Sequence, residues 1–389
     1  MISVAAASDR RRPLRRSERA ARVVQLWSAA FTIKSVRHCL AKLLILRLAL
    51  VFFCAISTVA AQTARPTPTP SLVYAIREPA AIKDYETDTR VVRAMVNRLV
   101  TAATGQPDAP RAWASLVRPT DTVGIKISAA GGELFTTHRD VVDAIVDGLV
   151  AAGHRRESII VWDRSLGGIV EADYRPQAGS YQIKAVAPGE GYDAKAIFTA
   201  PLMGNLVWGD FDYKGSPKAP PLSDEQNTSN ASHFARILVN EVTKVINVPV
   251  MSISESNAVA GCIYNMTIPN IDNWRRFTQT VGFGAESLAQ IYAHPLIAKK
   301  VVFNLMDGLL AQYAGGPQSQ PNWAMHHATL YASKDPVALD AVALRELQEW
   351  RKRTSLPPIG HTADYIQAAA QLGLGNAATN RIELRSVSP

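Results

Sequence analysis

The chain has 389 residues, of which 47% are apolar and 19% charged. It can therefore bury a sizeable core, which excludes a mainly disordered chain and a disulfide-stapled miniprotein. The net charge of +9 is concentrated at one end: residues 1–61 hold 11 basic and two acidic side chains, and residues 62–389 hold 31 of each. Because that remainder is neutral, it offers no general electrostatic attraction for nucleic acid, and we expect no nucleic-acid partner.

The first 61 residues have the layout of a secretory signal. A basic stretch precedes the apolar run 43–61, and Val59 and Ala61 occupy the small-residue positions of a cleavage site. We therefore expect a leader over 1–61, a Pro-rich linker over 62–80 and a periplasmic or secreted protein. Two alternatives stay open: export through a twin-arginine route, and an uncleaved inner-membrane anchor at 43–61, the one membrane contact that we expect.

Cysteine usage limits the chemistry of the mature chain. Cys39 and Cys54 belong to the leader, so Cys262 is alone after residue 61. One thiol forms no internal disulfide and cannot build an iron–sulfur or Cys-rich zinc site. No neighbouring residue in the sequence would lower its pKa, so we expect Cys262 to pack in the core.

Residues 81–389 alternate short apolar runs with amphipathic segments, which is typical of an α/β domain. The pattern predicts a single domain with a Rossmann-like, mostly parallel sheet and helices on both faces. A helix over 84–103 comes first. Strand 122–128, helix 139–152 and strand 158–162 then form a βαβ unit, whose two strands should be parallel with a right-handed crossover.

The middle of the chain is less regular. Residues 164–233 are rich in Gly, Pro and polar side chains, which predicts an insertion with short strands near 183–187 and 196–201. Regular elements then return: we expect strands at 235–239, 245–250, 300–305 and 330–333, helices at 286–293, 336–353 and 362–372, and an edge strand at 381–384.

Three residues near the ends of the first two predicted strands are the candidates for catalysis. A ligand of an open parallel sheet binds beyond the carboxyl ends of the strands. Lys126 lies in an apolar strand, where burial is costly unless a carboxylate or an anionic ligand meets it; the alternative is a long stem that reaches solvent. His138 precedes a helix and is the candidate acid or base, and Asp163 ends the second strand.

Candidate ligand-binding residues follow the later strands. The segment after strand 245–250 is the most polar one directly downstream of a buried strand, although its serines could simply cap the next helix. Aspartates also follow the two strands near 300–305 and 330–333. The predicted ligand-binding residues are Glu255, Asn257, Asn265, Asp307 and Asp335.

Several familiar cofactor motifs do not fit. Gly131-Gly132 matches neither a dinucleotide-binding glycine pattern nor a phosphate loop, and indicates a tight turn. His326 and His327 are adjacent, so their side chains diverge and do not predict zinc. The carboxylates at 163, 255, 307 and 335 could still converge on magnesium or calcium. The sequence identifies no cofactor, and no Gly-x-Ser-x-Gly nucleophile motif occurs.

Six segments form a recognisable combination: Val-Gly-Ile-Lys-Ile at 123–127, the His138 helix ending Ala-Ala-Gly-His at 151–154, Ile-Ile-Val-Trp-Asp-Arg-Ser at 159–165, Ile-Asn-Val-Pro-Val-Met at 246–251, a stretch with Gly-Gly-Pro at 307–317, and Ser-Lys-Asp-Pro-Val-Ala-Leu-Asp at 333–340. Over about residues 120–350 the chain resembles the domain-of-unknown-function family 362. The resemblance implies a Rossmann-type α/β fold and frequent export, with ferredoxin-like modules fused to some members. It implies no defined biochemical role.

One departure from the family pattern affects the expected function. Family members usually carry a Lys and a His after the Asn-Val-Pro-Val strand and a later Lys-Asn pair; here those places are 252–254 and Tyr264-Asn265. If the cations bind an anion in relatives, this chain has lost or altered that function. We expect an enzyme that acts on a small anionic molecule. The alternatives are a non-catalytic ligand-binding protein of the cell envelope and an electron-transfer accessory protein.

Overall fold

The sheet is built around the predicted strand–helix–strand unit. In the computed structural model, β4 (Val123–Ile127), α4 (Arg139–Ala151) and β5 (Ile160–Asp163) follow one another, and β4 and β5 pair in parallel. Every residue of β4 and β5 is buried, because helices cover both faces of a central parallel strand. The predicted α/β class with a mostly parallel sheet is confirmed.

The structure describes residues 69–188, 190–200, 231–278 and 284–389. The predicted leader and the apolar run 43–61 lie outside these ranges. Within them, no helix combines the length and the apolar character needed to cross a membrane. The part from Thr69 to Pro389 is one compact unit.

The main sheet has the strand order β14-β1-β13-β12-β9-β4-β5-β6. Parallel pairing joins β12, β9, β4, β5 and β6, whereas β13 is antiparallel to both β12 and β1. The strands not yet located are β1 (Ser71–Arg77), β6 (Gln182–Ala185), β9 (Lys244–Val248), β12 (Val301–Gln312), β13 (Ala324–Ser333) and β14 (Ile382–Ser386).

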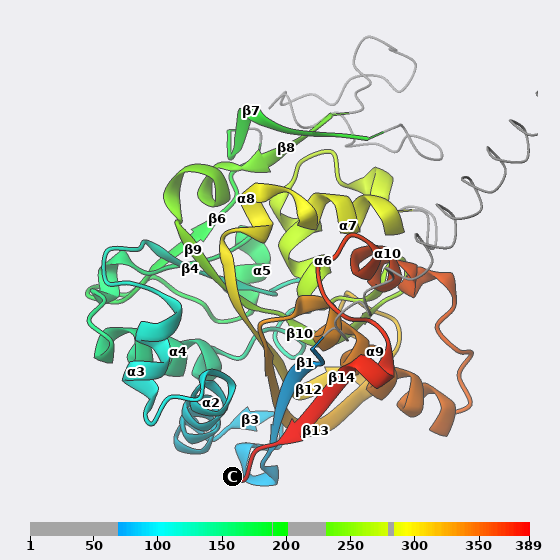
Figure 1. Ribbon diagram of the computed structural model, residues 1–389, viewed down its shortest axis with the longest axis horizontal. Helices are drawn as coiled ribbons and strands as arrows, with labels where there is room; N and C mark the ends of the chain where they lie inside the picture. The colour runs from blue at the N-terminus through cyan, green and yellow to red at the C-terminus, as the bar shows by residue number, and fades with distance from the viewer. Residues whose placement is uncertain (1–68, 189, 201–230, 279–283) are drawn as a thin grey trace, which may run out of the picture. The chain divides into compact units, whose positions relative to one another are not determined.

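The first and last strands lie side by side, as the blue and red arrows in Figure 1 show. Strand β1 falls inside the range 62–80 that the sequence predicts as a linker, so that prediction is wrong for 71–77. Val73 and Ile76 are fully buried, and β1 pairs with residues more than 250 positions away. The Pro-rich composition of the preceding residues gives no sign of such a distant pairing.

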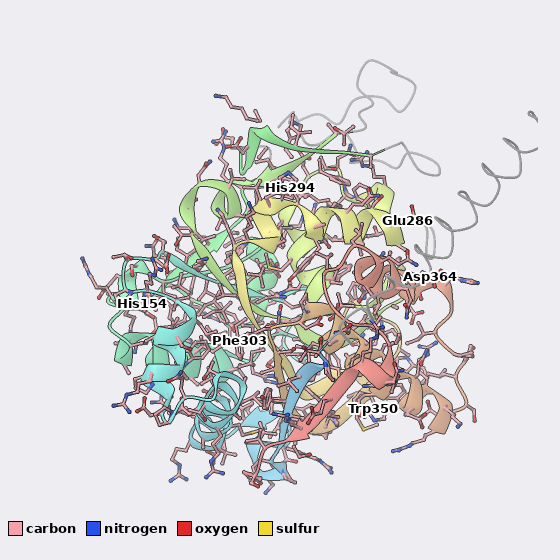
Figure 2. All side chains as sticks on the ribbon, in the orientation of Figure 1. His154, Glu286, His294, Phe303, Trp350 and Asp364 are labelled. Atoms are coloured by element: carbon pink, nitrogen blue, oxygen red, sulfur yellow. The ribbon has the colours of Figure 1, made fainter. Side chains whose placement is uncertain are left out.

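Helices form a layer on each side of the sheet (Figure 1). On one side, Trp113 packs edge-on against Phe303, with ring centroids 5.9 Å apart; Figure 2 labels Phe303 in the interior of the molecule. On this side lie α2 (Thr89–Thr104), α3 (Ala109–Leu116) and α4; on the other lie α6 (Cys262–Thr267), α7 (Ala285–Ala293), α9 (Pro336–Arg353) and α10 (Asp364–Gln371).

Helix α2 begins five residues later than predicted. Residues before it form the hairpin of β2 (Ile82–Lys83) and β3 (Glu86–Thr87), with Asp84 and Tyr85 at positive φ in the turn. Asp88 then caps the helix by accepting from two backbone N–H groups of its first turn. The apolar spacing predicted the helix correctly, but it did not distinguish the hairpin turn from the first helical turn.

The predicted insertion is smaller than 164–233. Helix α5 (Leu166–Glu171) and strand β6 belong to the main α/β unit, because β6 pairs with β5. Strands β7 (Tyr192–Thr199) and β8 (Ala231–Ala235) form a separate antiparallel pair, and residues 201–230 lie outside the described ranges. The strand predicted at 235–239 is wrong: Ile237–Glu241 form a π-helical turn, since a short apolar run fits a helix as well as a strand.

Strands β12 and β13 are longer than the sequence predicts. Strand β13 begins at Ala324 rather than at residue 330, and β12 extends to Gln312, so Asp307 lies inside β12 rather than at its end. The extension pairs with β10 (Val250–Ser254), which itself pairs with β11 (Ala258–Val259). The remaining short elements are η1 (Pro79–Ala81), η2 (Arg156–Ser158), η6 (Ile268–Asn270), η7 (Arg275–Phe277), α8 (Pro295–Ala298), η8 (Pro321–Trp323), η9 (His361–Ala363) and η10 (Thr379–Arg381).

Candidate functional site

The candidate site lies at the carboxyl edge of the sheet, between β4 and β9. Strands β5 and β6, which follow β4 in the chain, lie on one side of it in the sheet. Strands β9 and β12, which come later, lie on its other side. Such a reversal of strand order is where open α/β sheets bind ligands, because the loops diverge there.

The sheet branches at Pro249. This residue has no N–H to continue the ladder, and it separates β9 from β10, both of which pair with β12. We call this branch point the fork. Thr137 occupies the resulting place between β4 and β9. Its hydroxyl donates to the carbonyl of Val248 at 2.6 Å and accepts from the amide of Ser128 at 2.9 Å. The next residue, His138, is thereby held at the edge of the sheet.

His138 and Asp307 form a buried pair at the fork. One carboxylate oxygen of Asp307 lies 2.8 Å from His138 Nδ1 and accepts from the His138 backbone amide, also at 2.8 Å. The other oxygen accepts from the amide of Leu309 at 3.1 Å. Asp307 is fully buried and the His138 side chain is 12% exposed. The imidazole is thus fixed in one orientation.

The pair changes the basicity of His138. Burial alone would lower the pKa of the imidazole, but the charge and hydrogen bond of Asp307 outweigh it and raise the pKa above its usual value. The carboxylate favours the tautomer with its proton on Nδ1. Within the described ranges Nε2 has no hydrogen-bond partner, so this nitrogen is available to give or take a proton.

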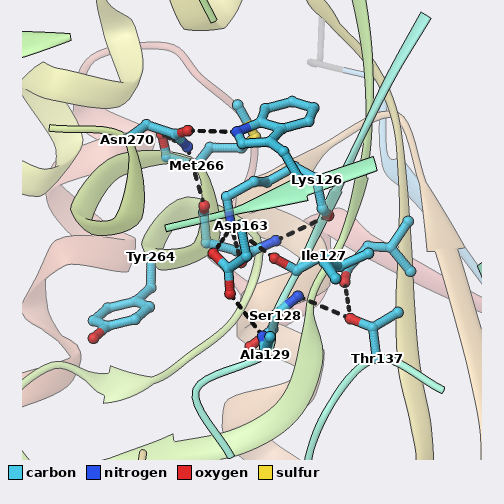
Figure 3. Close-up of polar contacts among 12 residues, drawn as sticks. Lys126, Ile127, Ser128, Ala129, Thr137, Asp163, Tyr264, Met266 and Asn270 are labelled. Carbon is cyan, nitrogen blue, oxygen red and sulfur yellow. Dashed lines mark hydrogen bonds and ion pairs between the residues drawn. The ribbon is translucent and has the colours of Figure 1, made fainter. Parts of the chain in front are cut away.

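Lys126 and Asp163 form a second, enclosed pair (Figure 3). The ammonium of Lys126 donates to Asp163 and to the carbonyl of Ile127, each at 2.6 Å, and to the side-chain oxygen of Asn265 at 3.0 Å. The second oxygen of Asp163 accepts from the amide of Ala129 at 2.7 Å. All three protons of the ammonium are therefore used within the protein.

The enclosed pair continues as a row of amides through the sheet. Asn265 donates to Asn247 at 2.8 Å, Asn247 donates to Asn304 at 2.9 Å, and Asn304 donates to the carbonyl of Ser333 at 3.3 Å. The three asparagines are at most 2% exposed. This polar row joins α6 to the central strands, since each amide satisfies the next.

Asp340 fixes the amino end of α6. Its carboxylate accepts from the amides of Cys262 and Ile263 at 2.6 and 3.0 Å and from the hydroxyl of Tyr365 at 3.2 Å. Burial raises the pKa of Asp340 to about 6, against the opposing effect of these hydrogen bonds. Cys262 is fully buried, as predicted, and burial raises the pKa of its thiol well above the usual value.

Lys126 therefore meets a carboxylate, the first of the two interpretations open for a buried lysine. It is 0% exposed, and the cost of burying its charge lowers its pKa despite the attraction of Asp163. A lysine with no free proton and no exposed surface cannot anchor a ligand in this arrangement. The interpretation of Lys126 as an electrostatic anchor is corrected on this point.

Three other predicted residues lie away from the fork. Strand β13 is antiparallel, with Ser333 opposite Asn304, so Asp335 lies toward the amino ends of the parallel strands and caps α9 instead. Glu255 has a side chain 56% exposed and accepts from the amide of Gly315 at 2.8 Å. Asn257 is buried, with its side-chain amide donating to a backbone carbonyl. Asp335 thus does not join the carboxyl edge, because its strand runs the other way.

The four carboxylates considered for a hard cation do not converge. Among the residues that the structure describes, no three or more His, Cys, Asp or Glu side chains lie close enough together to hold a metal ion. Asp163 and Asp307 instead have separate cationic or imidazole partners. No residue of this site is assigned to a cofactor.

Thr137 and Asn247 also belong to the site, and neither is among the residues predicted from the sequence. A hydroxyl just before a helix, such as that of Thr137, is a common bridging group, but its signal in the sequence is weak beside that of His138. Asn247 offered a clearer signal: it is a polar side chain in an otherwise apolar strand, β9, and is 0% exposed. Polar residues inside buried strands need partners, which makes them markers of such networks.

Two cavities of the described part lie elsewhere. One of about 450 Å³ is lined by α2, including Arg90 and Arg98, and by Pro389. The other, of about 550 Å³, is lined by Ser71 and Asp335 among others. Neither includes His138, so the fork is a candidate for its chemistry rather than for its volume.

Comparisons with known proteins give a family and no activity. No curated protein matches the chain. A crystal structure of a protein from Thermotoga maritima aligns with a TM-score of 0.38 and 9% identity, over 70% of this chain and 60% of that protein. The chain thus spans less than two thirds of that protein. The family described as "Domain of unknown function (DUF362)" matches residues 123–345, more than half of the chain, and the chain therefore belongs to this family.

Proposed function

We propose that this protein is an enzyme in which His138 acts as general acid or base on a small molecule at the sheet fork. The observation that carries the proposal is the 2.8 Å pair of Asp307 with His138 Nδ1, which leaves Nε2 without a partner in the described ranges. A carboxylate that orients an imidazole and raises its pKa is the usual arrangement for proton transfer near neutral pH.

The position of the pair supports the same proposal. His138 lies at the strand-order reversal, where loops can admit a ligand, and Thr137 holds its backbone against β4 and β9. The anionic character expected for the substrate rested on Lys126, and the closed contacts of that residue remove this support. The proposed activity therefore depends on the imidazole and on no charge at residue 126.

The test compares His138→Gln with His361→Gln as matched control. His361 also pairs with a carboxylate, Asp364, at 3.1 Å, but its side chain is 93% exposed. Each protein is incubated with a mixture of small metabolites from its host, and depletion is followed by mass spectrometry. We expect the wild type to convert at least one compound, His138→Gln to slow this about 10²- to 10⁴-fold, and the control to match the wild type.

Two results would contradict the proposal. Equal turnover by His138→Gln would remove the imidazole from the chemistry. Retention of a compound without conversion would instead support the alternative, a non-catalytic ligand-binding protein of the cell envelope. An electron-transfer accessory role has no specific observation in its favour.

We also propose that the protein is exported by its leader. The basic stretch and the apolar run 43–61 support this proposal, and the neutral remainder of the chain supports the absence of a nucleic-acid partner. N-terminal sequencing of the protein from the periplasmic fraction of its host should begin at Gln62. An intact leader in the membrane fraction would show the anchored alternative.

A further inference from the structure

A cationic cluster lies beside the fork, at the carboxyl end of β5. Arg164 follows Asp163 directly, and its guanidinium carbon lies 4.1 Å from the ring centroid of Trp274. The guanidinium of Arg275 lies 5.0 Å from the same centroid. Two positive charges therefore share one indole ring, which provides a flat surface for them.

Arg164 is half-buried and lacks an acceptor. Within the described ranges its guanidinium makes no hydrogen bond and no ion pair, although it carries five N–H donors. Burial lowers its pKa, and the nearby charge of Arg275 acts in the same direction. A partly desolvated guanidinium without a carboxylate is unfavourable unless another anion completes it.

Two neighbouring donors are also without acceptors. The indole N–H of Trp274 is buried and has no hydrogen-bond partner among the residues that the structure describes. The hydroxyl of Tyr264 has none in the described part of the chain either; burial raises its pKa to about 12, and the charge of Arg164 opposes this rise. Figure 3 shows the ring of Tyr264 pointing away from the Lys126–Asp163 pair.

The nearest carboxylate does not neutralise the cluster. Asp163 precedes Arg164, but its two oxygens are taken by the Lys126 ammonium and the Ala129 amide. Because Lys126 balances the charge of Asp163, that carboxylate does not compensate the positive charge of Arg164 at this end of β5. Among acceptors, a carboxylate or phosphate best matches the paired N–H groups of a guanidinium.

We propose that Arg164, held flat on Trp274 and flanked by Tyr264, binds the phosphate or carboxylate group of a small ligand. The anion accepts from the guanidinium and from the Tyr264 hydroxyl. The proposal concerns binding and stands apart from the acid–base role of His138, since no proton transfer is involved.

The indole N–H signal of Trp274 in the full, ¹⁵N-labelled chain reports on the site. It is assigned with Trp274→Phe, and the protein is titrated with inorganic phosphate and separately with acetate at fixed pH and ionic strength. We expect a saturable shift with at least one anion. Arg164→Gln should weaken this binding about tenfold or more, since charged hydrogen bonds are lost.

The matched control is Arg155→Gln. Arg155 lies before the other end of the same strand, and its side chain is 85% exposed, so its loss should leave the titration unchanged. A response to phosphate alone or to acetate alone identifies the preferred group. No saturable shift with either anion, or an equal shift in Arg164→Gln, would overturn the proposal.

A second variant decides the question if Arg164→Gln does not fold, as judged by circular dichroism. Arg164→Lys keeps the charge but loses the planar fork and its stacking, so binding should weaken severalfold. Unchanged binding by a folded Arg164→Lys would overturn the proposed geometry. Because no turnover is measured, these results do not depend on whether His138 is catalytic.

Discussion

The two polar pairs at the carboxyl edge have similar chemistry, but they differ in whether all of their hydrogen-bonding groups have partners. Lys126 and Asp163 are joined at 2.6 Å, and every proton of the ammonium has an acceptor. His138 and Asp307 are joined at 2.8 Å, and Nε2 has no partner in the described ranges. A network in which every polar group has a partner stabilises a fold. Proton transfer instead requires a group that is still able to donate or accept a proton. The difference separates the structural role of Lys126 from the catalytic role that we propose for His138 more clearly than residue type does.

The largest expected effect on stability comes from removing one member of the Lys126–Asp163 pair. Lys126→Met should lower the free energy of unfolding by about 3–5 kcal/mol, because Asp163 is left buried without its counter-charge. Urea unfolding followed by circular dichroism measures this loss. In the double variant Lys126→Met/Asp163→Leu, most of the stability should return, since replacing both members of a buried pair is often neutral.

A loss below about 1 kcal/mol in Lys126→Met would contradict the closed network, because an exposed pair behaves in that way. Failure of the double variant to recover would show instead that Asp163 matters mainly through the amide of Ala129, which it accepts from at 2.7 Å.

The next effect concerns the anchoring of α6, which brings Asn265 to the closed network. Asp340→Asn should cost about 1–3 kcal/mol at neutral pH, because an amide cannot accept from both backbone N–H groups and the Tyr365 hydroxyl. Urea unfolding again measures the change. Tyr365→Phe removes one of these contacts and should cost less; an Asp340→Asn variant as stable as the wild type would exclude the capping role.

The smallest effect on stability should come from the open pair, and it should depend on pH. His138→Gln should cost about 1–2 kcal/mol at pH 5.5. The folded pKa of His138 is raised, so its contribution is complete below the unfolded pKa of about 6.5 and is lost as pH rises through the folded pKa. The difference in melting temperature between wild type and His138→Gln should therefore shrink between pH 5.5 and pH 8.5.

A direct titration sharpens this prediction. The imidazole proton signals of His138, followed by NMR against pH, should give a lower pKa in Asp307→Asn than in the wild type, because Asp307 supplies the charge that raises it. An unchanged pKa in Asp307→Asn would show that the pair does not control the imidazole.

Local pattern predicted the centre of the fold well. Helix α9 has the predicted bounds, and α4 and α7 differ from theirs by one residue, because apolar residues recur at helical spacing in each. Helix α9 also has a side-chain cap, Asp335. Strand β1 and the extension of β12 were missed. Both depend on pairing with residues distant in sequence, which a single-sequence pattern does not contain.

The sequence predicted only part of the candidate site, because the rest of it also depends on contacts between residues distant in sequence. His138, Asp163 and Asp307 do lie near the ends or forks of parallel strands, as expected from the topology. The sequence did not reveal that Lys126 is closed by Asn265 or that β13 carries Asp335 to the other edge, since both follow from three-dimensional register. Whether a polar residue is satisfied is a property of its neighbours in space.

The position of β1 between β13 and β14 has a consequence for synthesis. The first strand acquires its two neighbours only when residues 324–386 have been made, so it stays unpaired while almost the whole chain emerges. The parallel strands at the centre can pair before β1 joins the sheet, so this side of the sheet is completed after them.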